Sequence, residues 1–439
     1  MFKRLLFALL VLGLFGGLAA GQVSLRVVCS PDNADALKWI ASEFMKQHPD
    51  IRVTVESISW ETLYPLQLAD FAGQVGGFDI FTWDVMTAGA VAQGCLDLAE
   101  FRRQHPELVD PNWNPEDFIP VVRYISGYWA GKEIGAPFYN NTMLLYYRKD
   151  LFENPAIQAQ FKSMFGKELT VPTSWAEAVD VAKFFTKKYN PKSPTEYGIA
   201  LMFPRTHTLF YMYLLFFGPY RRSMLAKFGP VDLDWGDYFT ADHKPAFDSI
   251  EGLRALQDMQ ALMPYAPDPL GSDYGETIEY FARGLVAMCP QWTGPYSEFK
   301  QALGEDKVGV ALMPGRSVSG NWALAINKFI PLEKQKAAFL FLQFATSSYA
   351  DKGKFIRFAV APTRQSTLSD PEVLAVDPRV PVLQETYATE TNRPRIPEEP
   401  KLEDLAVGYF SEMLLGTKPL TLETLHELAL KWLEVLGAK

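Results

Sequence analysis

The sequence predicts an α/β protein built of two lobes, and three observations support this fold class. The chain has 439 residues, which is too long for one ordinary hydrophobic core and favours two domains. Its first elements read as strand, helix and strand, the unit from which a parallel sheet covered by helices is built. Aromatic side chains also follow a short buried strand, at the sheet edge where α/β proteins bind ligands.

The opening unit is justified by its apolar pattern. A strand is expected at 24–29, and Asp32 or Asn33 can cap the helix that follows it. Alternating apolar residues predict a second strand at 51–55. A third strand at 78–82 leads directly into Trp83 and Asp84, which places an aromatic ring and a carboxylate together at a strand end.

The rest of the chain continues to alternate between strands and helices. Further strands are expected at 143–147, 199–203, 285–288, 308–312 and 323–326. Helices are expected at 60–73, from 174 to about 189, and at 250–263, 333–346, 402–415 and 421–436. The apolar stretch 209–217 is shorter than the ~20 residues that a membrane span needs, so it is interpreted as core.

Residues 282–296 form the stretch around which a binding site is predicted. The apolar run 285–288 has the pattern of a strand buried on both faces. Trp292 follows it, and the chain-breaking pair Gly-Pro then leads to Tyr296. We therefore expect Trp292 and Tyr296 to line a cleft between the two lobes.

Composition and the N-terminus restrict the possible functions. A formal net charge of −9 argues against nucleic acid as a partner, because phosphate binding needs a basic surface. Lys3 and Arg4 precede an apolar segment at 5–15 and several small residues, which is typical of a secretory signal peptide cleaved near Gly21. The protein is therefore expected to be exported. No ligand spacing for a metal is present, and neither a metal nor a cofactor is expected.

The three cysteines are Cys29, Cys95 and Cys289. An odd number in an exported protein leaves at least one thiol unpaired. Each cysteine has apolar neighbours in the sequence, so buried and unreactive thiols are the simplest interpretation.

An ordered series of motifs resembles the extracellular solute-binding proteins of bacterial ABC importers, in carbohydrate-binding family 1, which includes maltose-binding protein. The motifs are His-Pro-Asp-Ile-Arg-Val at 48–53, Gly-Phe-Asp-Ile at 77–80, Gly-Lys-Glu-Ile-Gly-Ala-Pro-Phe at 131–138, Pro-Thr-Ser-Trp at 172–175, Phe-Ala-Arg-Gly-Leu-Val-Ala-Met at 281–288, Gly-Pro-Tyr at 294–296, Gly-Asn-Trp at 320–322 and Lys-Ala-Ala-Phe at 336–339. Each motif is weak alone, but their order and spacing cover nearly the whole chain after residue 21.

The resemblance implies a two-lobed periplasmic-binding-protein type II fold. Each lobe would be a mostly parallel sheet flanked by helices, with the ligand cleft between the lobes. The first lobe would contain 22–138 and 287–344, and the second 139–286 and 345–439. Residues 285–288 would then lie at the hinge. The implied partners are a small sugar or polyol and the membrane permease subunits of an ABC importer, with the protein acting as a monomer.

The residues and the resemblance together nominate ligand contacts. Aromatic rings suit the apolar faces of sugars, and planar polar groups suit their hydroxyls. The candidates are Trp83, Asp84, Trp292, Tyr296, Asn321, Trp322, Trp60, Tyr274, Asp32, Asn33 and Arg364. For Arg364 and Arg393, which lie near proline breaks, a surface position is the simpler interpretation. The family also places a ligand contact near 205–211, at a register that the sequence leaves open.

Two other functions stay open at this point. The same fold could bind an anion such as a glycerol phosphate, which would require two or more Arg or Lys side chains in the cleft. A secreted carbohydrate-active enzyme would use two carboxylates across the scissile bond, and Glu61, Asp84 and Asp273 all lie beside aromatic residues. A neutral carbohydrate is favoured, because the strongest candidate contacts are aromatic, Asp and Asn. The family's C-terminal Trp has no counterpart at 396–404, which argues against a maltodextrin.

Overall fold

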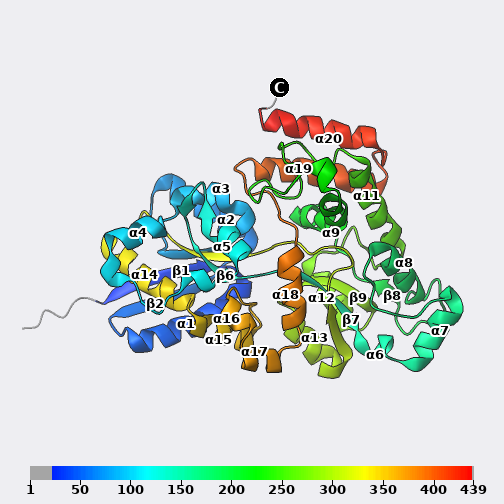
Figure 1. Ribbon diagram of the computed structural model, residues 1–439, viewed down its shortest axis with the longest axis horizontal. Helices are drawn as coiled ribbons and strands as arrows, with labels where there is room; N and C mark the ends of the chain where they lie inside the picture. Colours follow the sequence, from blue (N-terminus) through cyan, green and yellow to red (C-terminus); the bar gives the residue numbers. More distant parts are fainter. Residues whose placement is uncertain (1–21, 438–439) are drawn as a thin grey trace, which may run out of the picture.

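The computed structural model describes residues 22–437, so the predicted signal peptide at 1–21 lies outside the described residues. Figure 1 shows two lobes side by side, each with its own sheet and covering helices. The first lobe is drawn mainly in blue, cyan and yellow, and the second mainly in green. The predicted α/β fold of two lobes is confirmed.

The first lobe contains a five-stranded sheet in the order β2-β1-β3-β11-β6. Its strands are β1 (Val23–Cys29), β2 (Ile51–Ser57), β3 (Ile80–Asp84), β6 (Ala136–Tyr139) and β11 (Trp322–Ile326). β1 pairs in parallel with β2 and β3, whereas β11 runs antiparallel to β3 and β6. The sheet is therefore mixed and not mostly parallel, because β11 enters from the other lobe without a βαβ crossover.

The second lobe contains a four-stranded sheet in the order β10-β7-β9-β8. Its strands are β7 (Met143–Arg148), β8 (Tyr197–Ile199), β9 (Val286–Trp292) and β10 (Val308–Ala311). Only β8 and β9 pair in parallel. β9 and β10 both pair with β7, so residues 287–311 belong to the second lobe, and the expected assignment of 287–344 to the first lobe is wrong for this part. The expected hinge at 285–288 is wrong for the same reason, because this run leads into β9 in the middle of the second sheet.

Helices cover both sheets. Those of the first lobe are α1 (Pro31–Gln47), α2 (Trp60–Gly73), α3 (Ala88–Val91), α4 (Leu98–Gln104), α5 (Pro120–Gly127), α14 (Leu332–Ala345) and α15 (Ser348–Phe358), with the small hairpin β4 (Tyr128–Trp129) and β5 (Lys132–Glu133). Those of the second lobe are α6 (Lys149–Phe152), α7 (Pro155–Phe165), α8 (Trp175–Phe184), α9 (His207–Ser223), α10 (Leu225–Phe228), α11 (Ile250–Leu262), α12 (Tyr274–Ala282), α13 (Tyr296–Leu303), α19 (Glu399–Leu415) and α20 (Leu422–Val435). None of the helices at 22–437 combines the length and the hydrophobicity that a membrane span requires.

The chain passes between the lobes three times. The first passage joins β6 to β7, and the second joins β10 to β11. The third runs from α15 through α16 (Gln365–Leu368), α17 (Pro371–Val376) and α18 (Val380–Thr389) to α19, and Figure 1 shows α18 in orange between the lobes. Isolated bridges join Thr142 to Ser319 and Val318 to Thr391, so the three passages lie against one another.

Each lobe has its own buried core, and the three cysteines are divided between these cores. Cys29 and Cys95 pack in the first lobe, and Cys289 lies on β9 in the second. All three thiols are buried and unpaired, as expected. Burial raises the pKa of each of them, to about 12 for Cys29, which keeps the thiols protonated and unreactive.

Candidate functional site

A cavity of about 300 Å³ lies between the two lobes. This volume is at the lower end of the ~300–1,000 Å³ range of small-molecule sites. Aromatic rings from both lobes line it: Trp60 and Trp322 from the first, and Tyr211, Tyr274 and Trp292 from the second. The structure brings six of the predicted contacts together here, namely Asp32, Trp60, Asp84, Tyr274, Trp292 and Trp322.

Four helices begin at this cavity. Asp32 lies in the first turn of α1, and Trp60 is the first residue of α2. His207 and Tyr274 are the first residues of α9 and α12 on the opposite lobe. Helix N-termini carry partial positive charge and backbone N–H groups, so they favour oxygen-rich groups at the cavity wall.

The aromatic rings are held by one another. The rings of Trp60 and Trp322 meet edge to face, with centroids 5.4 Å apart. On the opposite lobe, the centroids of Tyr211 and Trp292 are 5.1 Å apart, and the indole Nε1 of Trp292 donates to Tyr211 Oη at 3.4 Å. The two pairs give the cavity rigid apolar surfaces on both of its sides.

A buried ion pair joins the two lobes beside the rings. Arg393, which follows α18, donates from Nη2 to Oδ1 of Asp84 at 2.5 Å. It also donates from Nε to the carbonyl of Ser319 at 3.2 Å. Burial raises the pKa of the Asp84 carboxyl, and the neighbouring guanidinium offsets part of that rise. Arg393 is only 4% exposed, so the surface position expected for it is wrong.

Two further carboxylates line the cavity and differ in their contacts. Asp273 caps α12 and accepts from the Oγ1 of Thr208 at 2.7 Å and from the N–H of Tyr274 at 2.8 Å. Asp32 makes no side-chain hydrogen bond or ion pair within residues 22–437. Although Asp32 stays solvent-accessible, surrounding protein removes part of its hydration and raises the pKa of its carboxyl. Its oxygens are therefore available to accept hydrogen bonds from a ligand.

Two predicted contacts, Trp83 and Asn33, lie in the core of the first lobe. The Trp83 side chain is 0% exposed, because neighbouring residues on β3 point to opposite faces and Asp84 takes the cavity side. Asn33 is also fully buried and donates from Nδ2 to the Oγ of Ser30 at 2.8 Å. Neither side chain reaches the cavity, so both are corrected to structural residues.

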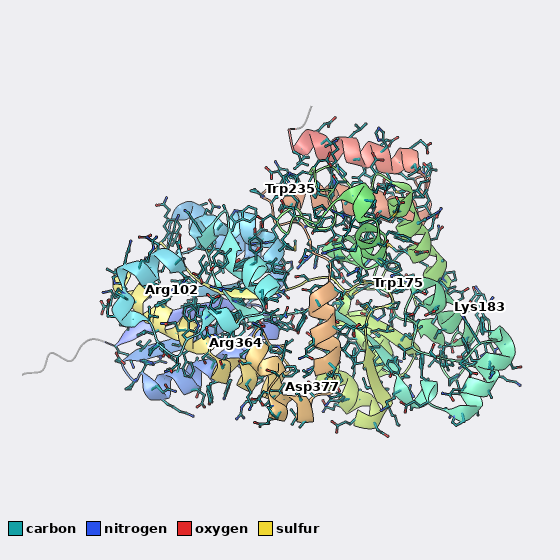
Figure 2. All side chains as sticks on the ribbon, viewed as in Figure 1. Arg102, Trp175, Lys183, Trp235, Arg364 and Asp377 are labelled. Atoms are coloured by element: carbon teal, nitrogen blue, oxygen red, sulfur yellow. The ribbon has the colours of Figure 1, made fainter. Side chains whose placement is uncertain are left out.

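Tyr296 and Arg364 also lie away from the cavity. The Tyr296 ring is covered by the Arg379 guanidinium, whose Cζ lies 4.3 Å from the ring centroid. Arg364 is 0% exposed and donates to the carbonyls of Thr346 and Asn114, at 2.7 and 2.6 Å. Figure 2 labels Arg364 on the first lobe, and its burial and its absence from the cavity lining show that it is neither a surface residue nor a ligand contact.

Asn321 is the remaining predicted contact outside the cavity. It precedes Trp322 in an extended segment, so the two side chains point to opposite faces. Trp322 lines the cavity, whereas Asn321 is 0% exposed behind it. Both residues of this motif were predicted to contact the ligand, but only Trp322 lines the cavity, and Asn321 lies on the opposite face.

Nine residues of the cavity lining were not among the predicted ligand contacts. They are Met86, Asn141, His207, Thr208, Tyr211, Asp273, Gly275, Gly320 and Arg393. Three of them fall in 205–211, which the family resemblance indicated without a register. The sequence presents Asp273 only as a carboxylate beside Tyr274, and the structure shows that it forms a capping box with Glu276. Within the described part of the chain, no group of three or more His, Cys, Asp or Glu side chains is placed to hold a metal ion.

Comparison with known structures agrees with this architecture. An ABC transporter solute-binding protein from Agrobacterium radiobacter K84, in complex with ribitol, has a TM-score of 0.74 and 25% identity, with 94% of this chain and 98% of that chain covered. A maltose-bound protein of T. maritima has a TM-score of 0.77 and 22% identity, with coverage of 94% and 100%. A D-mannitol-bound solute-binding protein from Agrobacterium vitis S4 has a TM-score of 0.71 and 22% identity, with coverage of 94% and 99%.

Sequence comparison gives the family. A probable amino-acid ABC transporter periplasmic-binding protein of Sinorhizobium fredii is 22% identical over 372 residues, which cover 83% of this chain and 78% of the relative. The pattern of the bacterial extracellular solute-binding proteins matches residues 30–351, well over half of the chain. The chain therefore belongs to the family of bacterial extracellular solute-binding proteins.

Proposed function

We propose that the protein binds an uncharged carbohydrate or polyol in the cavity between its lobes and delivers it to the permease subunits of an ABC importer. The observation that supports this most is the combination of rings and hydrogen-bonding groups on the cavity wall. Trp60, Trp292 and Trp322 offer flat surfaces for C–H faces, and Asp32 offers oxygens for hydroxyl groups. The predicted export signal fits a protein that works outside the cytoplasmic membrane.

The charges around the cavity favour an uncharged ligand over an anion. Arg393 is the only Arg or Lys side chain among the described lining residues, and its Nη2 already donates to Asp84. Asp32 and Asp273 add negative charge to the same wall. A bound phosphate or carboxylate would lie beside these carboxylates without an unpaired Arg or Lys side chain to balance its charge, and this repulsion would cost binding free energy.

Binding would close the lobes. A ligand that contacts Trp60 and Trp322 on one lobe and Tyr211 and Trp292 on the other stabilises the arrangement that brings these rings together. A ligand can drive closure only by binding the closed form more tightly than the open one. The permease would then recognise the closed protein.

Calorimetric titration tests the proposal. We expect binding of at least one member of a panel of ribitol, D-mannitol, D-tagatose and maltose, without product formation. Trp322→Ala should lower the affinity about tenfold or more, whereas Trp39→Ala, which removes a ring on α1, should leave it unchanged. Binding restricted to glycerol 3-phosphate or to free amino acids would contradict the proposal, and release of smaller sugars would favour the enzyme alternative.

A further inference from the structure

Residues 139–142 and 319–322, which belong to the first two passages between the lobes, pair as a short antiparallel ladder. This ladder forms the floor of the cavity. Trp322 pairs with Tyr139 at one end of the ladder. Ser319 bridges Thr142 at the other end. The same register holds at both ends, so four residues of each segment lie directly opposite one another.

The ladder has two different faces. Asn141, Gly320 and Trp322 line the cavity and define its front face. Because side chains alternate along a strand, Asn140 and Asn321 belong to the back face, opposite each other in the register. The bridged pair at the far end belongs to the back face as well. The back face is therefore separated from the ligand cavity by the backbone of the ladder.

The back face gathers buried polar atoms without partners. Asn140 and Asn321 are each 0% exposed, and neither the Oδ1 nor the Nδ2 of either has a hydrogen-bond partner in the described chain. The Oγ of Ser319 is in the same situation. Glu390, directly after α18, adds a carboxyl group with both oxygens buried and unpartnered. Buried polar atoms are almost always bonded to protein, ordered water or an ion.

Glu390 lies against this face without a counter-ion of its own. Burial raises the pKa of its carboxyl to about 8, although Thr142 and Asn321 lie close enough to lower it in part. Neither of these two residues reaches hydrogen-bonding geometry with the carboxyl. Arg222 is the cation whose charge acts on it, but the Nε and Nη2 of Arg222 are bonded to Asp237 at 2.5 and 2.9 Å.

We propose that the back face of the ladder binds one alkali cation, Na⁺ or K⁺, through side-chain oxygens of Asn140, Ser319, Asn321 and Glu390. Amide, hydroxyl and carboxylate oxygens are the ligands that hard cations prefer. One positive charge that takes the place of the Glu390 proton neutralises the single carboxylate, whereas a divalent ion would leave an uncompensated buried charge. The ion would join all three passages between the lobes and so stabilise the floor of the cavity.

Thermal unfolding of the mature protein tests this proposal. Melting temperatures are compared in NaCl, KCl and tetramethylammonium chloride at equal ionic strength. We expect Na⁺ or K⁺ to raise the melting temperature by about 1–3 °C over tetramethylammonium, with saturation as the concentration rises. Glu390→Gln should abolish the difference. Glu399→Gln is the matched control, because Glu399 is a buried glutamate with an unpartnered oxygen that lies on α19 and not on the ladder, and it should keep the difference.

Equal melting temperatures in the three salts would overturn the proposal. If Glu390→Gln does not fold, Ser319→Ala takes its place and should reduce the response to the cation. Crystals soaked in Tl⁺, a K⁺ substitute with strong anomalous scattering, should show a peak beside Glu390. A saturated soak without a peak there would also overturn the proposal.

Discussion

Substituting Gly320 by alanine tests whether the floor of the cavity fixes the position of Trp292. A Cβ atom at Gly320 would lie 2.4 Å from Cζ3 and 2.6 Å from Cη2 of the Trp292 ring. Because non-bonded carbon atoms pack at about 3.5 Å, the ring has to move by about 1 Å in Gly320→Ala.

Trp292 has little space for this movement. Its side chain is 8% exposed, packs against Tyr211 and ends the buried strand β9. Overpacking of this kind costs about 1–3 kcal/mol. For a protein of 439 residues, such a loss lowers the melting temperature by about 1–3 °C. Because the displaced ring lines the cavity, ligand affinity should fall by about tenfold as well.

Scanning calorimetry measures the melting temperature. Calorimetric titration with a sugar or polyol that the wild-type protein binds measures the ligand affinity. Gly275→Ala is the control, because Gly275 lines the same cavity and a Cβ there has no atom within 4 Å. The control should keep both the melting temperature and the affinity. Wild-type values for Gly320→Ala would refute the reasoning, since they would show that Trp292 does not rest on the floor of the cavity.

Three further predictions concern buried polar and aromatic groups. Arg393→Met leaves Asp84 buried without a counter-ion, so urea unfolding should show a loss of about 3–5 kcal/mol; an unchanged midpoint would contradict the ion pair. Trp83→Phe should lower stability but keep ligand affinity, because the ring lies in the core; a loss of affinity in titrations would restore Trp83 to the site. Burial raises the pKa of Glu403 to about 7, so the stability that protonated Glu403 contributes is complete below pH ~4.5 and is lost as pH rises through about 7. Burial also raises the pKa of its neighbour Glu399 well above the usual range, so the loss of the Glu399 contribution is complete only at higher pH. Thermal melts from pH 4.5 to 8 should show this decline and its reduction in Glu403→Gln, and a decline of equal size in both proteins would exclude Glu403 as its source.

Local patterns predicted the elements well, because helices and strands follow from apolar spacing. The expected strands at 24–29 and 51–55 correspond to β1 and β2, and three of the four residues of the run 285–288 lie within β9. Strand pairing was not predictable in the same way. Residues of β7 and β9 that pair are more than 140 positions apart, so nothing in the local sequence assigns β9 to the second lobe.

The candidate site shows a similar division between local and long-range information. Sequence reasoning found where aromatic and polar residues adjoin, as at 83–84 and 321–322. In each pair only one side chain can face the cavity, and which one it is depends on how the strand sits in the sheet. Arg393 was missed for a different reason: its partner Asp84 is 309 positions away, and the sequence alone presents it as one more surface charge.

In the proposed function, ligand binding and lobe closure depend on each other through two groups of contacts. Some of the inter-lobe contacts that the chain makes for itself lie at the floor of the cavity, where Tyr139 Oη lies 3.0 Å from the hydroxyl of Thr293 and Arg393 reaches Asp84. Others lie outside the cavity lining, such as the bond from Tyr124 Oη to Asp234 at 3.3 Å. If the lobes rotate about the three chain passages, as the proposed function requires, the contacts at the floor should change little and should hold the hinge together without determining its angle. The rings of Trp60 and Trp292 belong to different lobes and can act on each other through a ligand. The free energy that closes the lobes should therefore come mainly from the ring contacts and the floor should keep the hinge aligned, so ring variants should change ligand affinity more than stability.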